Sequence, residues 1–331
     1  MTSLKESEHL SLPFPVIEAA TKKFTTFIGK GGYGPVYKGE LLLSGKLTMV
    51  AVKRLDIKMS KESGQGLKEF LTEIQLLSRY KHQNIVSLLG FCDQGNEKIL
   101  IYEYAEHGSL DTYLRGPCTF TWKQRINICI DAASGLEHLH NHVSENHSLI
   151  HRDIKSGNIL LGYNWKAMIA DLGLSKIGLA NENVSCVVTH ACGTDGYLDP
   201  EYRRTGILTK ESDIYSFGVV LFEVLCGRLS YMNVPNIQRY LDQLARCYYE
   251  EHKLDDIIDP SVKNQIDSNS LFTYSKIAYE CLLINRPERP AIATVVQRLK
   301  DAMKFQLCGG GDFADVTMLW NRWFVTVVFG N

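Results

Sequence analysis

Hydrophobic positions follow different periods in the first third of the chain and in the remainder. Between about residues 28 and 104 they fall in short strand-like runs, of which FIGKGGYGPVYKGELL, LTMVAVKRL and KILIYEY are the clearest. One stretch here, LKEFLTEIQLLSRY, instead has Phe70, Ile74 and Leu77 at the spacing of one helix face. This part is therefore predicted to be a small β-rich unit with one helix.

From about Ser109 onward the pattern is mainly helical. One predicted helix, WKQRINICIDAASGLEHLHNH, has four apolar residues on a single stripe: Ile126, Ile130, Ala133 and Leu136. The segment SDIYSFGVVLFEVLCG is apolar nearly all round, which is typical of a helix buried inside a domain. The segment ATVVQRLKDAMKF predicts a final amphipathic helix. The fold class is thus α+β with two lobes, and the cleft expected near Glu103 to Glu106 is a favoured ligand site.

Composition narrows the class of protein. The 331 residues carry a formal net charge of -1, with 45% hydrophobic and 22% charged residues, as in ordinary soluble globular proteins. The near-neutral charge gives no support to nucleic-acid binding. The sequence contains no run of about 18 apolar residues, so no transmembrane segment is predicted. The N-terminus does not resemble a signal peptide, and its second residue is not the glycine that N-myristoylation requires. Nine scattered cysteines without a C-x-x-C pair indicate reduced thiols in an intracellular compartment.

A glycine-rich stretch, GKGGYGPV, has Gly29, Gly31 and Gly34 at G-x-G-x-x-G spacing. The spacing alone also fits an ordinary hairpin turn. A dinucleotide-binding interpretation has Asp56 at a suitable distance for a ribose contact, but it requires a helix directly after the glycines. Pro35 and an alternating strand pattern follow instead. A strand–turn–strand flap with backbone N–H groups over phosphates is therefore favoured.

Charged and amide side chains then follow in a suggestive order. Lys53 ends the strand VAVK, and Glu73 shares the inward face of the predicted helix. Farther along, HRDIKSGNILL and MIADLGLSK contribute four more: Asp153, Lys155, Asn158 and Asp171. Each alone fits a solvated surface residue. Together they suit phosphoryl transfer, which depends on positioning and on stabilising negative charge.

In this order the motifs resemble those of eukaryotic protein kinases. Three segments resemble the plant receptor-like (Pelle-type) group: FPVIEAATKKF, VSLLGFCDQGNEKILIYEYAEHGSLDTYL and GYLDPEYRRTGILTKESDIYSFGVVLFEVLCGR. The last segment also resembles the malectin-like receptor branch of that group. The resemblance implies a bilobal kinase domain over residues 24–306, with an N-lobe over about 24–102, a hinge at 103–106 and a C-lobe at 107–306. Residues 1–23 would be a juxtamembrane-like segment, and the tail 307–331 has no assigned role.

The resemblance also implies an ATP site. The phosphates would be covered by the glycine loop and its neighbours: Ile28, Gly29, Lys30, Gly31, Gly32, Gly34 and Val36. The adenine ring would lie among Ala51, Leu160 and the backbone of Glu103 to Ala105, with Tyr102 at the back. Lys53, braced by Glu73, would hold the α- and β-phosphates.

Catalytic roles are implied in the same way. Asp153 would orient the attacking hydroxyl, and Lys155 would neutralise the γ-phosphate. Asn158 and Asp171 would bind Mg²⁺, with Mn²⁺ as an alternative metal. Thr194 would tie the substrate platform to Asp153 and Lys155. Because dedicated tyrosine kinases usually have an Ala-containing loop at this point, Lys155 predicts transfer to Ser and Thr.

Further expectations concern structure and regulation. Glu201 would pair with Arg289, and Asp213 would anchor the catalytic loop from below. Two residues of the activation segment, Ser185 and Thr189, are candidate phosphorylation sites whose phosphate would bind Arg152.

Alternatives to an active protein kinase stay open. Leu172 replaces the more familiar Phe of D-F-G, and it is expected to be a packing variant beside Leu77, Leu88 and His151. A pseudokinase scaffold and a small-molecule phosphotransferase are the other candidates. Expected partners are ATP, protein substrates and a membrane receptor kinase. The chain would be a receptor-like cytoplasmic kinase, peripheral at the plasma membrane through a partner, or the intracellular portion of a longer receptor.

Overall fold

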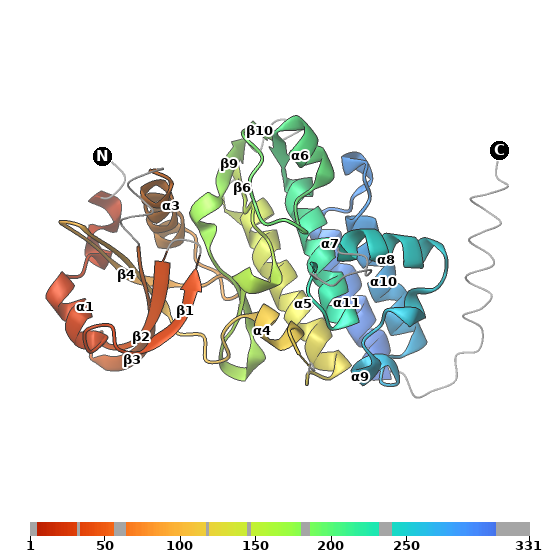
Figure 1. The fold of residues 1–331 in the computed structure, drawn as a ribbon, viewed down its shortest axis with the longest axis horizontal. Helices are drawn as coiled ribbons and strands as arrows, with labels where there is room; N and C mark the ends of the chain where they lie inside the picture. Colours follow the sequence, from red (N-terminus) through yellow and green to blue (C-terminus); the bar gives the residue numbers. More distant parts are fainter. Residues whose placement is uncertain are drawn as a thin grey trace.

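The structure is a computed structural model that describes residues 5–31, 34–55, 64–116, 119–143, 147–179, 186–231 and 240–308. A β-rich lobe from the first part of the chain lies at one end of the long axis, and a helical lobe occupies the other end (Figure 1). This arrangement confirms the predicted α+β bilobal fold. No helix within the described ranges is long and apolar enough to cross a bilayer.

The N-lobe is an antiparallel sheet with the order β1-β2-β3-β5-β4. Its strands are β1 (Phe27–Gly31), β2 (Gly34–Leu43), β3 (Lys46–Arg54), β4 (Leu88–Gln94) and β5 (Glu97–Glu103). In β3, Val50 and Val52 are fully buried, whereas Ala51 and Lys53 point to the opposite face because side chains alternate along a strand. Lys53 pairs with Val36 across the sheet, so the sheet brings the lysine and the glycine loop to the same face.

The N-terminal segment packs into the N-lobe. It contains η1 (Lys5–Leu10) and α1 (Phe14–Ala20). The Leu12 backbone N–H donates to the Phe91 carbonyl of β4 at 2.8 Å. Ile17 is fully buried with apolar residues of the sheet: Leu41, Val50, Val52, Cys92, Ile99 and Ile101. The predicted boundary at residue 24 therefore falls inside a continuous hydrophobic core.

One long helix, α3 (Gln65–Arg79), lies on the other side of the sheet and carries the predicted stripe. Phe70, Ile74 and Leu77 are at most 2% exposed. They belong to the main core, which also contains Leu172 of η5 (Leu172–Leu174). Since α3 packs directly on η5, its position is coupled to the D-L-G segment.

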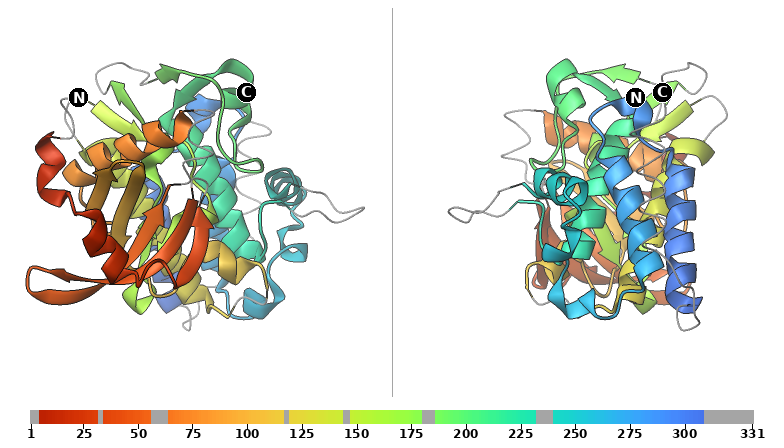
Figure 2. Two further views of the ribbon diagram at one scale, coloured as in Figure 1. Left: turned by 60° about the vertical axis from the view of Figure 1, so that its left-hand side comes forward. Right: turned by 90° about the vertical axis from the view of Figure 1, so that its right-hand side faces the viewer.

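The C-lobe is built around α7 (Lys210–Cys226), in which every residue from Ser212 to Cys226 is buried. Figure 2 shows the other helices of the C-lobe. They are α4 (Leu110–Leu114), α5 (Trp122–Glu137), α6 (Pro200–Thr205), α8 (Leu241–Glu250), α9 (Pro260–Lys263), α10 (Ser268–Cys281) and α11 (Ile292–Cys308), with the π-helix η2 (His138–His142) and the 3-10 helices η6 (Leu254–Asp256) and η7 (Arg286–Glu288). The all-round apolar pattern of α7 thus has the physical cause predicted from the sequence, namely burial on every side.

Short antiparallel strand pairs lie outside the N-lobe sheet. The pairs are β6 (His147–Ile150) with β9 (Lys176–Leu179), β7 (Ile159–Leu161) with β8 (Ala167–Ile169), and β10 (Cys186–Val188) with β11 (Ile207–Thr209). The turns η3 (Ser156–Asn158) and η4 (Tyr163–Trp165) complete this region. The H-R-D loop leaves β6 and the D-L-G segment leaves β8, so both reach the junction of the lobes.

Candidate active site

A partly buried ion cluster joins the two lobes. Lys53 Nζ lies 3.1 Å from Glu73 Oε1 and 2.8 Å from Asp171 Oδ1. The Glu73 side chain is 1% exposed, and Oε2 accepts a hydrogen bond from the Tyr102 hydroxyl. Lys53 of β3 and Glu73 on the buried face of α3 meet because the sheet packs against this helix. The cluster would hold an ammonium group at a fixed place beside a bound nucleotide.

The cluster sets the charge state of its members. Burial lowers the pKa of Lys53, but Asp171 and Glu73 outweigh it and hold that pKa above its ordinary value. Burial raises the pKa of Asp171, yet the Lys53 ammonium brings the net shift below the usual range. Burial also raises the pKa of Tyr102, and the neighbouring Glu73 carboxylate adds to the effect. Lys53 is therefore a cation and Asp171 an anion at neutral pH.

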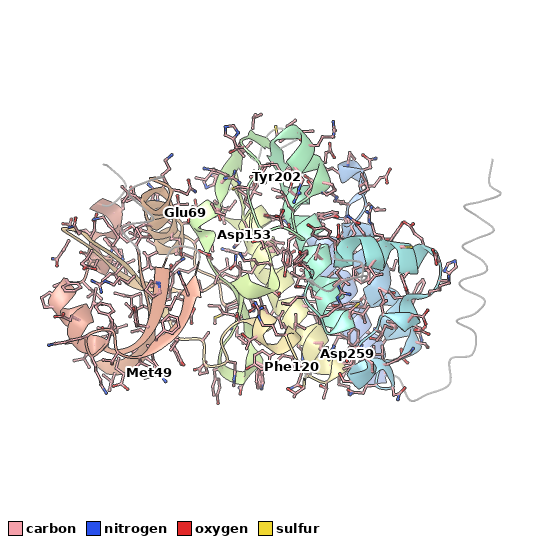
Figure 3. All side chains as sticks on the ribbon, viewed as in Figure 1. Met49, Glu69, Phe120, Asp153, Tyr202 and Asp259 are labelled. Atoms are coloured by element: carbon pink, nitrogen blue, oxygen red, sulfur yellow. The ribbon has the colours of Figure 1, made fainter. Side chains whose placement is uncertain are left out.

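The catalytic loop rests on a buried aspartate of α7. Asp213 Oδ2 accepts from the His151 backbone N–H at 2.7 Å, and Oδ1 accepts from the Arg152 N–H at 2.8 Å. Asp213 Oδ2 also lies 2.9 Å from His140 Nε2. The Asp213 side chain is 1% exposed. These bonds fix the loop immediately before Asp153, which Figure 3 shows near the junction of the lobes.

Asp153 is surrounded by the other predicted groups. Lys155 Nζ donates to Asp153 Oδ2 at 2.7 Å and to Thr194 Oγ1 at 2.8 Å. The Thr194 hydroxyl donates to Asp153 Oδ1 at 2.7 Å. Asn158 Nδ2 donates to the Asp153 carbonyl at 2.8 Å and to Oδ2 at 3.1 Å. These donors fix the orientation of the Asp153 carboxylate. A group that positions a substrate hydroxyl needs such a fixed orientation. We call residues 194–198 the substrate platform.

The donor set fits a magnesium ion. Both contacts of the Asn158 amide to Asp153 use its nitrogen, so its oxygen points elsewhere. Asp171 uses Oδ1 toward Lys53, and within the described ranges no hydrogen bond engages its Oδ2. Carboxylate and amide oxygens are the protein ligands that Mg²⁺ prefers. Asn158 and Asp171 could hold the ion.

The predicted nucleotide-contacting residues lie on the elements that border this cluster. Ile28, Gly29, Lys30 and Gly31 are in β1, and Gly34 and Val36 are in β2. Gly31 is close to Lys53, because a Cβ on this glycine would lie 3.6 Å from Lys53 Cε. Gly32 lies outside the described residues. Glu103 ends β5 and Ala105 follows it, while Leu160 of β7 bridges to Ser109. The roles of these residues in binding remain predictions.

Leu172 is completely buried in the main core together with Leu77 and Leu88. His151 is also fully buried, and its Nε2 lies 3.1 Å from the Ala170 carbonyl just before D-L-G. Leu172 offers no polar atom to a metal or a nucleotide. Its environment fits the packing role expected from the sequence.

The activation segment approaches the H-R-D arginine. Arg152 Nη2 donates to Thr189 Oγ1 at 3.1 Å and to the His190 carbonyl at 2.6 Å. Arg152 Nε donates to the Tyr202 hydroxyl at 2.9 Å. The other candidate phosphorylation site, Ser185, lies outside the described residues. Thr189 is therefore the candidate whose hydroxyl faces a guanidinium group.

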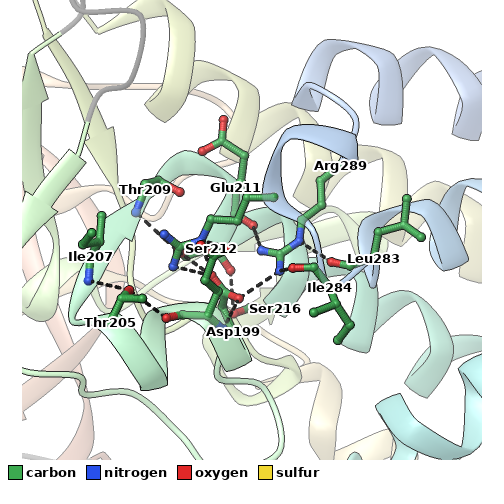
Figure 4. A network of polar contacts seen from close by, with 12 residues as sticks. Asp199, Thr205, Ile207, Thr209, Glu211, Ser212, Ser216, Leu283, Ile284 and Arg289 are labelled. Atoms are coloured by element: carbon green, nitrogen blue, oxygen red, sulfur yellow. Dashed lines mark hydrogen bonds and ion pairs between the residues drawn. The ribbon is translucent and has the colours of Figure 1, made fainter.

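The predicted pair between Glu201 and Arg289 is wrong. Arg289 Nη2 instead binds Asp199 Oδ1 at 2.9 Å (Figure 4). Glu201 Oε2 lies 3.4 Å from Arg286 Nε. The reason is geometric. Asp199 is the N-cap of α6 and is fully buried, and its Oδ1 accepts from both the Glu201 backbone N–H and Arg289. Glu201, in the first turn of α6, is one-third exposed.

Two further contacts were not foreseen from the sequence. The Tyr102 hydroxyl reaches Glu73, although only a place behind the adenine ring was predicted for it. Tyr197 of the substrate platform donates its hydroxyl to the fully buried Glu223 of α7 at 2.6 Å. The sequence offers two signals for these contacts. Tyr102 follows the aliphatic run ILI, and Glu223 interrupts the apolar run GVVLFEVL.

Comparison with known proteins agrees with this geometry. The sequence profile described as protein tyrosine and serine/threonine kinase matches residues 23–299, most of the chain. The chain belongs to this kinase family. The match includes the Lys53, Asp153 and Asp171 motifs and ends within α11.

Relatives from Arabidopsis thaliana narrow the group. The chain is 44% identical over 313 residues to the receptor-like protein kinase HERK 1, 41% over 320 residues to FERONIA and 43% over 302 residues to ANXUR1. These alignments cover 92%, 92% and 90% of this chain. They cover 36%, 34% and 34% of the relatives, so the chain spans about a third of their length. The predicted resemblance to malectin-like receptor kinases is confirmed.

Proposed function

We propose that this kinase chain is catalytically active and transfers the γ-phosphate of ATP to Ser and Thr hydroxyls of protein substrates in the presence of magnesium. One observation carries the proposal: Asp153, Lys155 and Thr194 form a closed triangle of hydrogen bonds of 2.7 to 2.8 Å. A second charged cluster, Lys53 with Glu73 and Asp171, supports it. Both clusters are required because phosphoryl transfer depends on positioning and on charge.

Each side chain has a definite task. Asp153 orients the substrate hydroxyl and accepts its proton as the oxygen attacks phosphorus. Lys155 and Lys53 place positive charge near the phosphate oxygens, and Glu73 fixes the direction of Lys53. Asn158 and Asp171 would hold magnesium, which when bound neutralises phosphate charge. Thr194 links the peptide-facing segment to Asp153.

The preference for Ser and Thr rests on the catalytic loop. Lys155 is bound to both Asp153 and Thr194, so its ammonium group is part of the site and not a solvated surface charge. A loop of this kind resembles those of Ser/Thr kinases. Phosphoamino-acid analysis that finds only phosphotyrosine would contradict this specificity.

A catalytically inactive scaffold is the alternative function. The decisive experiment is transfer of labelled phosphate from ATP-Mg to the chain itself and to a generic protein substrate. Wild-type protein should incorporate label, whereas Asp153→Asn and Lys53→Met should abolish incorporation. Lys46→Met is the matched control, because Lys46 is an exposed residue of the same strand β3. Absence of label in the wild-type protein under several metal conditions would favour the scaffold.

The cellular location and the partners of this activity are proposed from similarity to the relatives alone. The relatives are named receptor-like protein kinases, and we propose that this chain also acts in receptor signalling in the cytoplasm. Its partners would include ATP, protein substrates and a membrane receptor kinase that brings it to the plasma membrane. Autophosphorylation is expected. Recovery of the chain with a receptor kinase from plasma-membrane fractions would test this part.

A further inference from the structure

The carboxylate of Asp199 binds groups from three elements. Oδ2 accepts from Arg286 Nε at 3.0 Å and Nη2 at 2.9 Å, and from the Ser212 hydroxyl at 2.9 Å. Oδ1 accepts from Arg289 Nη2 at 2.9 Å and from the Glu201 backbone N–H at 3.0 Å. The Asp199 side chain is 0% exposed. Asp199 therefore connects the start of α6 to α7 and to the turn η7.

The two arginines depend on Asp199 to different degrees. Arg289 is also 0% exposed, and Asp199 is its ion-pair partner among the described residues. Its other donors reach only backbone carbonyls: Leu283, Ile284 and Glu211. Arg286 contacts both Asp199 and Glu201. Neutralising Glu201 leaves both arginines paired, whereas neutralising Asp199 leaves Arg289 buried without a counter-charge, which is strongly unfavourable.

Asp199 directly follows the substrate platform. At the other end of the platform, Thr194 is bound to Asp153. In between, the Tyr197 carbonyl accepts from the Ser216 hydroxyl of α7 at 2.8 Å. We propose that Asp199, and not the Glu201 of the same motif, is the residue that positions the platform for the protein substrate. The inference rests on the proposed kinase function for its activity readout.

A positioning role predicts a selective defect. Asp199 acts on the platform through Ser212, Arg286 and Arg289, and none of its bonds reaches Lys53 or Asp171. Loosening the platform should therefore weaken the use of peptide substrate while nucleotide affinity is preserved. A defect in the general packing of the chain would instead affect both substrates.

The experiment compares two matched neutralisations, Asp199→Asn and Glu201→Gln. For each variant we would measure KM for a Ser-containing peptide, the Kd of ATP-Mg by calorimetry, and hydrogen exchange of residues 194–198. Asp199→Asn should raise the peptide KM roughly tenfold or more, because small misplacements of this kind are costly. It should also speed platform exchange while changing the ATP Kd less than about twofold. Glu201→Gln should change each quantity less than about threefold.

A milder variant covers the case in which Asp199→Asn does not fold. Ser212→Ala removes one donor from Asp199 and none from the Glu201 carboxylate, and it should raise platform exchange and peptide KM in the same direction. Larger effects for Glu201→Gln than for the Asp199-directed variants would overturn the proposal. Equal changes in peptide KM and ATP Kd would do the same. Hydrogen exchange needs no catalysis, so an inactive wild-type chain would contradict the proposed function and not this inference.

Discussion

Tyr102 donates a hydrogen bond from its hydroxyl to Glu73 Oε2, while Glu73 Oε1 binds Lys53. The residue behind the predicted adenine pocket thus directly fixes the carboxylate that braces the phosphate-binding lysine. Both Tyr102 and Glu73 are buried, so loss of the hydroxyl would remove a donor from a carboxylate that is shielded from bulk water.

Tyr102→Phe should therefore destabilise the chain and impair its use of ATP. Loss of a donor to a buried carboxylate costs about 1–3 kcal/mol. With Lys53 less well held, kcat/KM for ATP should fall roughly threefold to tenfold. Thermal unfolding and steady-state kinetics measure the two effects. Tyr279→Phe is the matched control, since that hydroxyl binds an exposed glutamate. An unchanged kcat/KM in Tyr102→Phe would show that the bond has no role in catalysis.

Leu172 should tolerate a change of shape and not a loss of volume. Because its side chain is 0% exposed in the main core, Leu172→Ala should reduce the free energy of unfolding by about 2–5 kcal/mol. Leu172→Met conserves volume and should cost less than about 1.5 kcal/mol. Phosphate transfer should persist in the Met variant, because position 172 supplies no polar ligand. Loss of transfer in a folded Met variant would contradict the packing role.

The charged site could be predicted because its residues lie in short motifs of fixed spacing. Lys53 lies near the end of β3, whereas Asp153 and Asp171 follow the short strands β6 and β8. Strand alternation is enough to place Lys53 on the sheet face opposite Val50 and Val52. The lobes could be predicted for a similar reason: the periods of two and 3.6 residues are local properties of the sequence.

The wrong pairing of Arg289 shows where local patterns are insufficient. Asp199 and Glu201 lie in the same motif, about 90 residues before this arginine, and both have the right charge. The choice between them depends on the N-cap geometry of α6, which turns one carboxylate inward. Local patterns are also insufficient to predict the burial of Ile17, because it depends on contacts with β2, β3, β4 and β5.

Thr189 should be phosphorylated in the active protein. Its hydroxyl lies 3.1 Å from Arg152 Nη2, and a phosphate there would form a stronger, charge-assisted contact that orders the segment. Mass spectrometry of autophosphorylated protein should find the modification. Thr189→Val should lower peptide phosphorylation roughly tenfold, whereas Thr72→Val on α3 should not. Full activity with Thr189 unmodified would rule out this mechanism.

Glu223 should make stability depend on pH near neutrality. Burial raises its pKa from 4.5 to about 7, so the folded state binds this proton more tightly than the unfolded state. The resulting stabilisation is fully present below pH 4.5 and is lost as the pH rises through 7. Glu223→Gln should thus be more stable than wild type at pH 8, by roughly 1 kcal/mol or more, with a smaller difference at pH 5. Melting curves from pH 5 to 8.5 test this, and a pH-independent difference would contradict it.

Ile17 should contribute as much to the stability of the N-lobe as a buried residue within the predicted kinase domain, residues 24–306. Its side chain is 0% exposed against five residues of the sheet core with aliphatic side chains, Leu41, Val50, Val52, Ile99 and Ile101. Ile17→Ala should therefore lower the free energy of unfolding by about 2–5 kcal/mol. Its neighbour Val16 is 45% exposed, and Val16→Ala should change stability by no more than about 0.5 kcal/mol. Denaturant unfolding measures both. Equal, small effects would mean that the segment before residue 24 contributes little to the lobe, whereas the expected contrast makes α1 part of the folding unit.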